Sequence, residues 1–231
     1  MREHIHESKE KIKIYIIGAG VSGLIAAKVL EENGYFPTLV ESSNDVGGRL
    51  KTILKGGYQL DKGFQVLLTA YPQAKKHLNY KELKLQKLIS GACVFSKNKQ
   101  HVIGNPVKNI SLLIPTLFSD IGIFSDKLKI LKLYLYLRFK SIEKIFLSKE
   151  LKTIDYLKRL GFSKKIINDF FKPFFAGIFL ETELSTSSKM FEFVFKMFAQ
   201  GDVAIPESGI REIPYQIAKK LTKTNFIFNT E

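Results

Sequence analysis

Lys11-Ile-Lys-Ile-Tyr-Ile-Ile-Gly18-Ala-Gly20-Val-Ser-Gly23 is the stretch that decides the fold of this 231-residue chain. Its alternating and then consecutive isoleucines predict a buried parallel strand formed by Ile12, Ile14, Ile16 and Ile17. The glycines predict a direct turn from this strand into a helix over about residues 21–33. Gly18 permits the tight turn, Gly20 lets a pyrophosphate approach the backbone, and Gly23 lets the helix pack closely on the strand. The stretch therefore predicts a dinucleotide site at the helix N-terminus, where Val21 and Ser22 offer free N–H groups.

A second strand and an acidic residue complete this motif. The helix is expected to end at Asn33-Gly34, and residues 36–40 are expected to form a strand that carries Glu41 at its end. The spacing from Gly18 to Glu41 is close to the roughly 20 residues typical of dinucleotide sites. Glu41 can then accept both ribose hydroxyls, and its charge disfavours a nucleotide with a 2′-phosphate. The alternative is a tight strand-helix turn that binds no ligand.

The residues after Glu41 distinguish FAD from NAD. The turn Gly47-Gly48-Arg49 can close backbone N–H groups on phosphates, and its guanidinium offers further donors. With this turn the sequence resembles the flavin amine oxidase superfamily, which includes protoporphyrinogen oxidase and the phytoene desaturases. The matching residues are Gly18, Gly20, Gly23, Leu24, Ala27, Glu41, Gly47, Gly48 and Arg49. The resemblance implies that FAD is the cofactor and that the Gly-Gly-Arg turn lies along its pyrophosphate.

The same resemblance indicates which residues lie near the flavin ring. A strand-like segment, residues 58–68, is interrupted by a glycine, and the family has a similar strand and turn beside the isoalloxazine. Gly63, Phe64 and Gln65 are therefore candidate flavin neighbours. The alternative is an ordinary strand with Asp61 and Lys62 exposed in its turn.

The domain organisation follows from a change of pattern along the chain. We expect an α/β fold in which a Rossmann-like FAD-binding domain begins at residues 1–70, a mostly helical substrate domain is inserted at 71–200, and 201–231 return to the FAD-binding domain. A turn containing Pro206 and Gly209 resembles the family's return to that domain. Aromatic stripes at helical spacing are usually core, but the resemblance makes five residues candidates for pocket lining: Phe174, Phe175, Phe191, Phe195 and Met197. Family members are substantially longer, so the resemblance indicates the N-terminal part of an enzyme, with a missing C-terminal half or a homo-oligomer as candidate partners.

The net charge of +14 suggests an anionic partner. Nucleic acid is not favoured, because the chain has neither zinc-finger spacing nor an RNA-recognition signature. Residues 126–146 instead predict a basic amphipathic helix, which is typical of peripheral membrane contact. Its apolar stripe is Leu128, Leu131, Leu135, Phe139, Ile142 and Phe146, and its cations are Lys127, Lys129, Lys132, Arg138, Lys140 and Lys144. The alternative is a domain helix whose stripe faces a core.

Other residue types limit the chemistry. The single cysteine, Cys93, cannot form an internal disulfide and is expected to be a small buried hydrophobe. No signal-peptide pattern and no run of 18 uncharged apolar residues is found, so a cytoplasmic protein, possibly peripheral on the membrane, is expected. His77 and His101 are isolated and expected at the surface. No catalytic residue is named and no metal site is predicted.

These observations together predict an FAD-dependent oxidoreductase that removes a hydride from an apolar or amine small molecule. Two alternatives remain open. An NAD-linked dehydrogenase would leave Gly47-Gly48-Arg49 unexplained. A catalytically incomplete fragment could instead act as a membrane- or partner-binding module.

Overall fold

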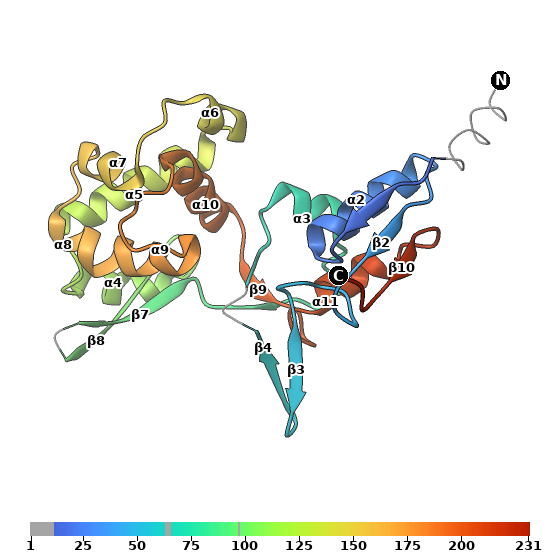
Figure 1. The fold of residues 1–231 in the computed structure, drawn as a ribbon. Helices are drawn as coiled ribbons and strands as arrows, with labels where there is room; N and C mark the ends of the chain where they lie inside the picture. The colour runs from blue at the N-terminus through green and yellow to red at the C-terminus, as the bar shows by residue number, and fades with distance from the viewer. Residues whose placement is uncertain (1–11, 63–65, 97) are drawn as a thin grey trace. The chain divides into compact units, whose positions relative to one another are not determined.

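The computed structural model of the chain describes residues 12–62, 66–96 and 98–231. These residues form two compact units (Figure 1). Unit 1 comprises residues 1–88 and 204–231, and unit 2 comprises residues 89–203. The division differs from the predicted one at residues 71–88, which belong to unit 1, and at residues 201–203, which belong to unit 2. Residues 71–88 belong to unit 1 because Leu78, Leu83 and Leu85 pack against the hydrophobic core of that unit.

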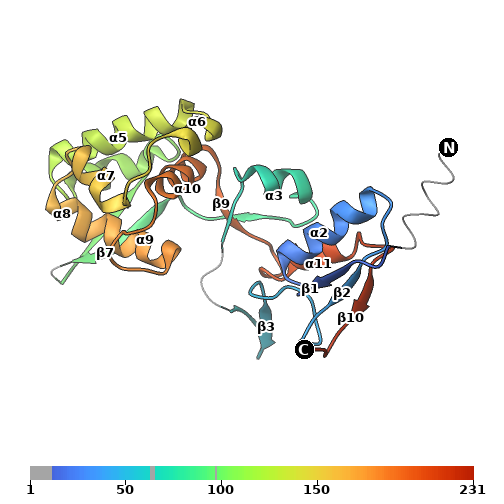
Figure 2. The ribbon, with the colours of Figure 1, turned by 45° about the horizontal axis from the view of Figure 1, so that its top comes forward.

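Unit 1 is built on a small parallel sheet with the strand order β1-β2-β10 (Figure 2). The strands are β1 (Tyr15–Ile17), β2 (Thr38–Val40) and β10 (Asn225–Ile227), with Ile16, Leu39 and Phe226 in register. Helix α2 (Val21–Glu32) follows β1, and α11 (Glu212–Ala218) packs against α2. Their apolar faces meet the sheet in a core that contains Leu24, Leu39, Ile213 and Ile217. This is the expected strand-turn-helix unit, followed by a second parallel strand.

The prediction that all four isoleucines of the first strand are buried is wrong. Ile17 is 82 % exposed and Ile12 is 50 % exposed, whereas Ile16 packs against the core. The alternation of side chains along a strand directs Ile16 toward the helices and Ile17 to the opposite face, whereas Ile12 lies before the start of β1. In the described residues that opposite face is left accessible to solvent.

The remaining elements of unit 1 are short. An antiparallel hairpin joins β3 (Thr52–Lys55) and β4 (Tyr58–Asp61). A second sheet has the order β5-β9-β6, formed by β5 (Leu67–Leu68), β9 (Val203–Ile205) and β6 (Gln86–Lys87). Helix α3 (Pro72–His77) follows β5. Its last residue, His77, is buried rather than at the surface, because its ring lies against α2, with Nδ1 3.4 Å from the Lys28 ammonium.

Unit 2 is mostly helical and begins with an antiparallel hairpin, β7 (Gly91–Ser96) and β8 (Lys99–Gly104). The helices that follow are η1 (Ile110–Leu112), α4 (Leu113–Phe118), α5 (Phe124–Phe139), α6 (Ile142–Leu147), α7 (Thr153–Arg159), α8 (Lys164–Ile166), the π-helical turn η2 (Ile167–Phe171), α9 (Lys172–Phe179) and α10 (Ser188–Gln200).

Cys93 corrects another prediction, because it is exposed. On β7, Ala92 and Val94 pack against the core of unit 2. The strand period of two then places Cys93 on the outer face of the hairpin. A small apolar residue can therefore be exposed even when the residues next to it in the sequence are apolar.

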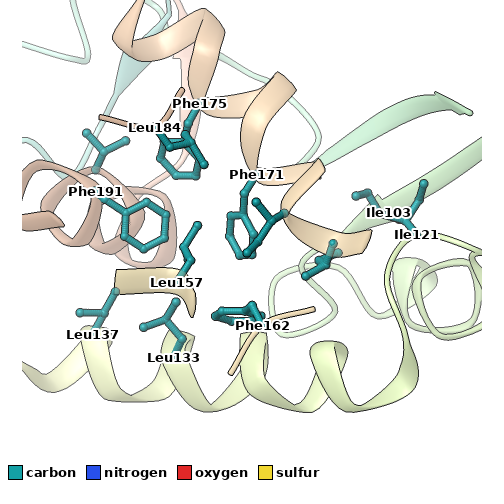
Figure 3. Close-up of a cluster of buried hydrophobic side chains, with 13 residues drawn as sticks. Ile103, Ile121, Leu133, Leu137, Leu157, Phe162, Phe171, Phe175, Leu184 and Phe191 are labelled. Atoms are coloured by element: carbon teal, nitrogen blue, oxygen red, sulfur yellow. The ribbon is translucent and has the colours of Figure 1, made fainter. Parts of the chain in front are cut away.

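The core of unit 2 is rich in phenylalanine (Figure 3). The rings of Phe175 and Phe191 have centroids 4.8 Å apart, and Phe171 contacts both. Figure 3 also shows Leu133 and Leu137 of α5 pointing into this cluster. The candidate pocket residues Phe175 and Phe191 are core residues, as helical aromatic stripes usually are. Met197 is fully buried, and Phe174 and Phe195 pack against the core.

The single helix predicted over residues 126–146 is wrong. Helix α5 ends at Phe139, Lys140 has extended backbone angles, and Ser141 caps a separate helix, α6, by accepting a hydrogen bond from the Lys144 N–H. The hydroxyl of a serine favours such a helix start over continuation of the preceding helix. The alternative in which the stripe faces a core is also wrong for Leu128, Leu131, Leu135 and Phe139, all of which are exposed.

Candidate cofactor site

The turn between β1 and α2 has the geometry that its glycines predict. Gly18 has a φ of +94°, which favours glycine, and its N–H donates to the Val40 carbonyl at 2.7 Å. A Cβ on Gly23 would lie 2.0 Å from the Gly18 carbonyl oxygen, so helix and strand could not approach this closely with any other residue. Both glycines are therefore required by the protein itself.

Gly20 is different. It is the residue that caps α2, with φ −69° and ψ 172°, an extended conformation open to every L-residue. A Cβ built on it would meet no atom of the described residues within 4 Å. Neither backbone strain nor packing among the described residues requires a glycine here. Because residue 20 is a glycine, no N-cap side chain accepts a hydrogen bond from the N–H groups of the first turn of α2, and that turn contains no acid. Its N–H groups thus remain an anion-attracting helix end.

The Gly-Gly-Arg turn packs directly against this helix start. The Gly47 N–H donates to the Ala19 carbonyl at 2.8 Å, and Gly20 and Gly47 form a parallel bridge. A Cβ on Gly48 would lie 3.3 Å from the Gly20 Cα. Both glycines of the turn have positive φ, +116° and +56°. Arg49 follows on the exposed end of the turn, so its guanidinium is accessible.

Glu41 lies at the end of β2 and is buried. Its Oε1 accepts hydrogen bonds from the Ser43 N–H at 2.9 Å and the Ser43 hydroxyl at 2.8 Å, and its Oε2 accepts one from the Ala19 N–H at 2.7 Å. The bonds from Ser43, opposed by burial and supported by Ala19, hold the pKa of the Glu41 carboxyl below its usual value. The group is an anion next to the glycine turn, and Oε2, which accepts one bond, retains acceptor capacity for a hydroxyl.

The structure thus brings together the predicted residues from two segments: Gly18, Gly20, Val21 and Gly23 with Glu41, Gly47 and Gly48. Ser22 is exposed on the first turn of α2. Gly63, Phe64 and Gln65 lie outside the described residues. Within the parts of the chain that the structure describes, no three His, Cys, Asp or Glu side chains are arranged to hold a metal ion.

Two contacts that support the site were missed in the sequence. The Tyr215 hydroxyl donates to the Asp45 carboxylate, and this bond raises the pKa of the tyrosine. Thr52 donates to Asp61 at 2.5 Å and accepts from the Arg211 N–H at 3.1 Å. Both contacts join the N-terminal segment to residues near α11. No local pattern predicts the Tyr215–Asp45 and Arg211–Thr52 bonds, because each joins residues more than a hundred positions apart.

Comparison with known proteins identifies the family. A family model described as flavin containing amine oxidoreductase matches residues 21–231. The chain therefore belongs to this family, whose cofactor is FAD. None of the helices in the described residues is both long and apolar enough to cross a lipid bilayer.

Individual relatives match parts of the chain. Protoporphyrinogen oxidase 2 of Arabidopsis thaliana is 27 % identical over 114 residues, which is 49 % of this chain and 21 % of that protein. A 4,4′-diapophytoene desaturase of Staphylococcus aureus is 40 % identical over 57 residues, 25 % of this chain and 11 % of that protein. The crystal structure of an oxidoreductase from Methanosarcina mazei aligns with a TM-score of 0.68 and 19 % identity, covering 94 % of this chain and 51 % of that one. The chain thus spans about half the length of this solved structure and a smaller share of the two relatives.

Proposed function

We propose that this chain binds FAD at the glycine turns of unit 1 and contributes to an oxidoreductase that removes a hydride from an apolar or amine small molecule. The family membership supports the cofactor. The names of the two relatives, an oxidase of protoporphyrinogen and a desaturase of diapophytoene, support an extended apolar substrate. When bound, FAD would supply the electron-accepting chemistry, and the protein would supply binding and orientation.

The observation that carries the proposal is the open space over Gly20. Residue 20 is a glycine although the backbone conformation and the surrounding described atoms would both accept a Cβ. A ligand whose phosphates lie against the Gly20 backbone explains why the position has no side chain. Gly47 and Gly48 would then present their backbone to the same phosphates, with Arg49 as a further donor, and Glu41 would accept from the ribose.

The contact between the two turns favours FAD over NAD. The Gly47–Gly48 turn packs directly on Gly20, so any ligand at the helix start also meets this turn. An NAD-linked dehydrogenase gives no role to that turn or to Arg49. A binding module without a cofactor gives no role to the glycine at position 20.

The test is the visible absorption spectrum of the purified chain, followed by release of the chromophore and comparison with FAD and FMN. We expect FAD in the wild type or on its addition. Gly20→Ala should fold and bind FAD at least tenfold more weakly. Gly177→Ala is the matched control, because that glycine in α9 also has open space around it and should leave FAD binding unchanged. A folded, colourless chain that rejects added FAD, or a Gly20→Ala variant with normal affinity, would contradict the proposal.

A further inference from the structure

Helix α5 of unit 2 carries a continuous apolar stripe on its solvent side. The α5 stripe consists of Phe124, Leu128, Leu131, Leu135 and Phe139, spaced by three or four residues, so that they share one face of the helix. Their exposed fractions range from 42 % for Leu131 to 82 % for Phe139. Scattered exposed apolar residues are ordinary, but five in one row are typical of an interaction surface.

The stripe is not the core face of the helix. Leu133 and Leu137 point the other way, into the phenylalanine cluster (Figure 3). Asp126 is fully buried and accepts hydrogen bonds from the Ile123 and Ser163 N–H groups, both at 3.0 Å, and from the Ser163 hydroxyl at 2.5 Å. One face of α5 therefore packs against the rest of unit 2. The opposite face is exposed and is also apolar.

The exposed charges on α5 itself are of one sign. Lys132 and Arg138 are exposed on α5, whereas its one acidic residue, Asp126, is buried on the core side. At the C-terminal end of the helix, the Lys196 ammonium donates to the Leu137 and Arg138 carbonyls, both at 2.9 Å. The partial negative charge of this helix end is thus offset within the protein. An exposed apolar stripe beside cations, with no exposed carboxylate on the helix, is complementary to an anionic surface with an apolar interior.

Helix α4 adds to the same surface. The Lys127 ammonium donates to the Leu117 carbonyl at 2.5 Å and the Ser119 carbonyl at 2.8 Å, which holds the end of α4 beside the first turns of α5. Phe118, at that end, is 84 % exposed. An aromatic ring held at this position extends the apolar surface at the N-terminal end of the stripe.

We propose that the α5 stripe, with Phe118, docks on an anionic lipid bilayer, with its apolar side chains in the headgroup-acyl boundary and Lys132 and Arg138 at the phosphates. The surface differs from the one expected from the sequence, because it ends with α5 and includes α4. A second copy of the chain is a poorer occupant, since the same cations would face each other. The proposal goes beyond cofactor binding and does not depend on it.

Flotation of the full chain with phosphatidylcholine vesicles, with and without phosphatidylserine, tests the proposal. We expect binding only to the anionic vesicles and a decrease as salt is raised. Leu131→Gln/Leu135→Gln should weaken binding at least roughly tenfold, because both lost side chains would enter the bilayer. Lys132→Glu should weaken it at least about fivefold. The matched control is Leu54→Gln/Leu60→Gln, which replaces two exposed leucines of the β3-β4 hairpin and should have no effect.

Three outcomes would overturn the proposal. One is binding that does not depend on phosphatidylserine, and another is equal binding by the stripe and hairpin variants. The third is a wild-type dimer, detected by light scattering without vesicle binding, that the stripe variant dissociates. Circular dichroism confirms that each variant is folded. We expect all of them to fold, because the substituted side chains are exposed.

Discussion

The backbone N–H of Ala19 donates to the Glu41 carboxylate, with 2.7 Å between the nitrogen and Oε2. The Ala19 carbonyl in turn accepts the Gly47 N–H at 2.8 Å. One residue of the glycine turn therefore joins both the end of β2 and the Gly-Gly-Arg turn. Because both bonds are formed within the protein, the three segments of the candidate cofactor site are arranged before a ligand binds.

The first prediction concerns the contribution of Glu41 to stability. Its pKa is lowered in the folded chain, so its stabilising effect is present above the unfolded pKa, near 4.5, and is lost as pH falls through the lower folded pKa. We expect Glu41→Gln to reduce the free energy of unfolding at neutral pH by about 1.5–3 kcal/mol. The difference between variant and wild type should shrink below pH 4.5. Urea unfolding over a pH series measures both effects.

Glu32→Gln is the control for this experiment. Glu32 is an exposed acid on α2 whose nearest ammonium, that of Lys28, is 3.7 Å away. Its replacement should change the free energy of unfolding by less than about 0.5 kcal/mol at any pH. If the free energy of unfolding of Glu41→Gln fell with decreasing pH in the same way as that of wild type, the hydrogen bonds of the Glu41 carboxylate would not be the cause of the stability that wild type loses in acid.

The second prediction separates two glycines of the same turn by their effect on folding. Gly23→Ala places a Cβ 2.0 Å from the Gly18 carbonyl oxygen, so α2 must move away from β1. We expect a loss of about 3 kcal/mol or more in the free energy of unfolding. Gly20→Ala meets no atom and should stay within about 0.5 kcal/mol of wild type. Equal unfolding midpoints for the two variants would show that the packing of α2 on β1 is not as close as described.

The sequence predicted those parts of unit 1 whose cause is local. Helix α2 begins at Val21 and ends at Glu32, and Gly34 follows with a φ of +82°, because the turn glycines and the C-terminal glycine act within a few residues of themselves. The FAD family was likewise recognisable, since its motif is continuous in sequence. The strand before Gly18 was only half right, because the exposure of Ile17 depends on what covers the other face of the sheet.

Tertiary contacts account for what the sequence did not show. The bond between Tyr215 and Asp45 depends on how α11 packs, and no pattern near either residue requires it. In α5 the leucine stripe was visible, but Leu133, Tyr134 and Leu137 form a second apolar face between its lysines, and this second face is the buried one. With apolar residues on both sides, helical periodicity cannot decide which side faces the core.

The third prediction tests the corrected position of Cys93. Its thiol lies on the outer face of the β7-β8 hairpin and is exposed. We expect the one thiol of the chain to react with a water-soluble disulfide reagent in the native state at a rate within about tenfold of that in urea. A thiol that reacts only after unfolding would place Cys93 in the core instead. Cys93→Ser should abolish the reaction and leave the free energy of unfolding nearly unchanged.

The fourth prediction concerns a buried ion pair in unit 2. The Lys140 ammonium lies 2.5 Å from Oε2 of Glu192, and the Tyr156 hydroxyl donates to Oε1 at 2.5 Å. Both charged side chains are almost inaccessible, 11 % and 5 % exposed. Glu192→Leu would leave the ammonium buried without its counter-charge, so we expect a loss of about 3–5 kcal/mol in the free energy of unfolding. Adding Lys140→Met should restore much of that loss, because the buried charge is then removed together with its partner.

A double-mutant cycle followed by urea unfolding and circular dichroism measures the coupling between the two residues. The exposed pair Lys158 and Asp155, 3.9 Å apart on α7, is the matched control, and its coupling should stay within about 0.5 kcal/mol. Tyr156→Phe should cost about 1 kcal/mol, since one hydrogen bond to the carboxylate is lost while the ion pair remains. If Glu192→Leu proved no less stable than the double variant, the two charges would not be paired in the folded chain, and the start of α10 would be held to the end of α5 by apolar packing alone.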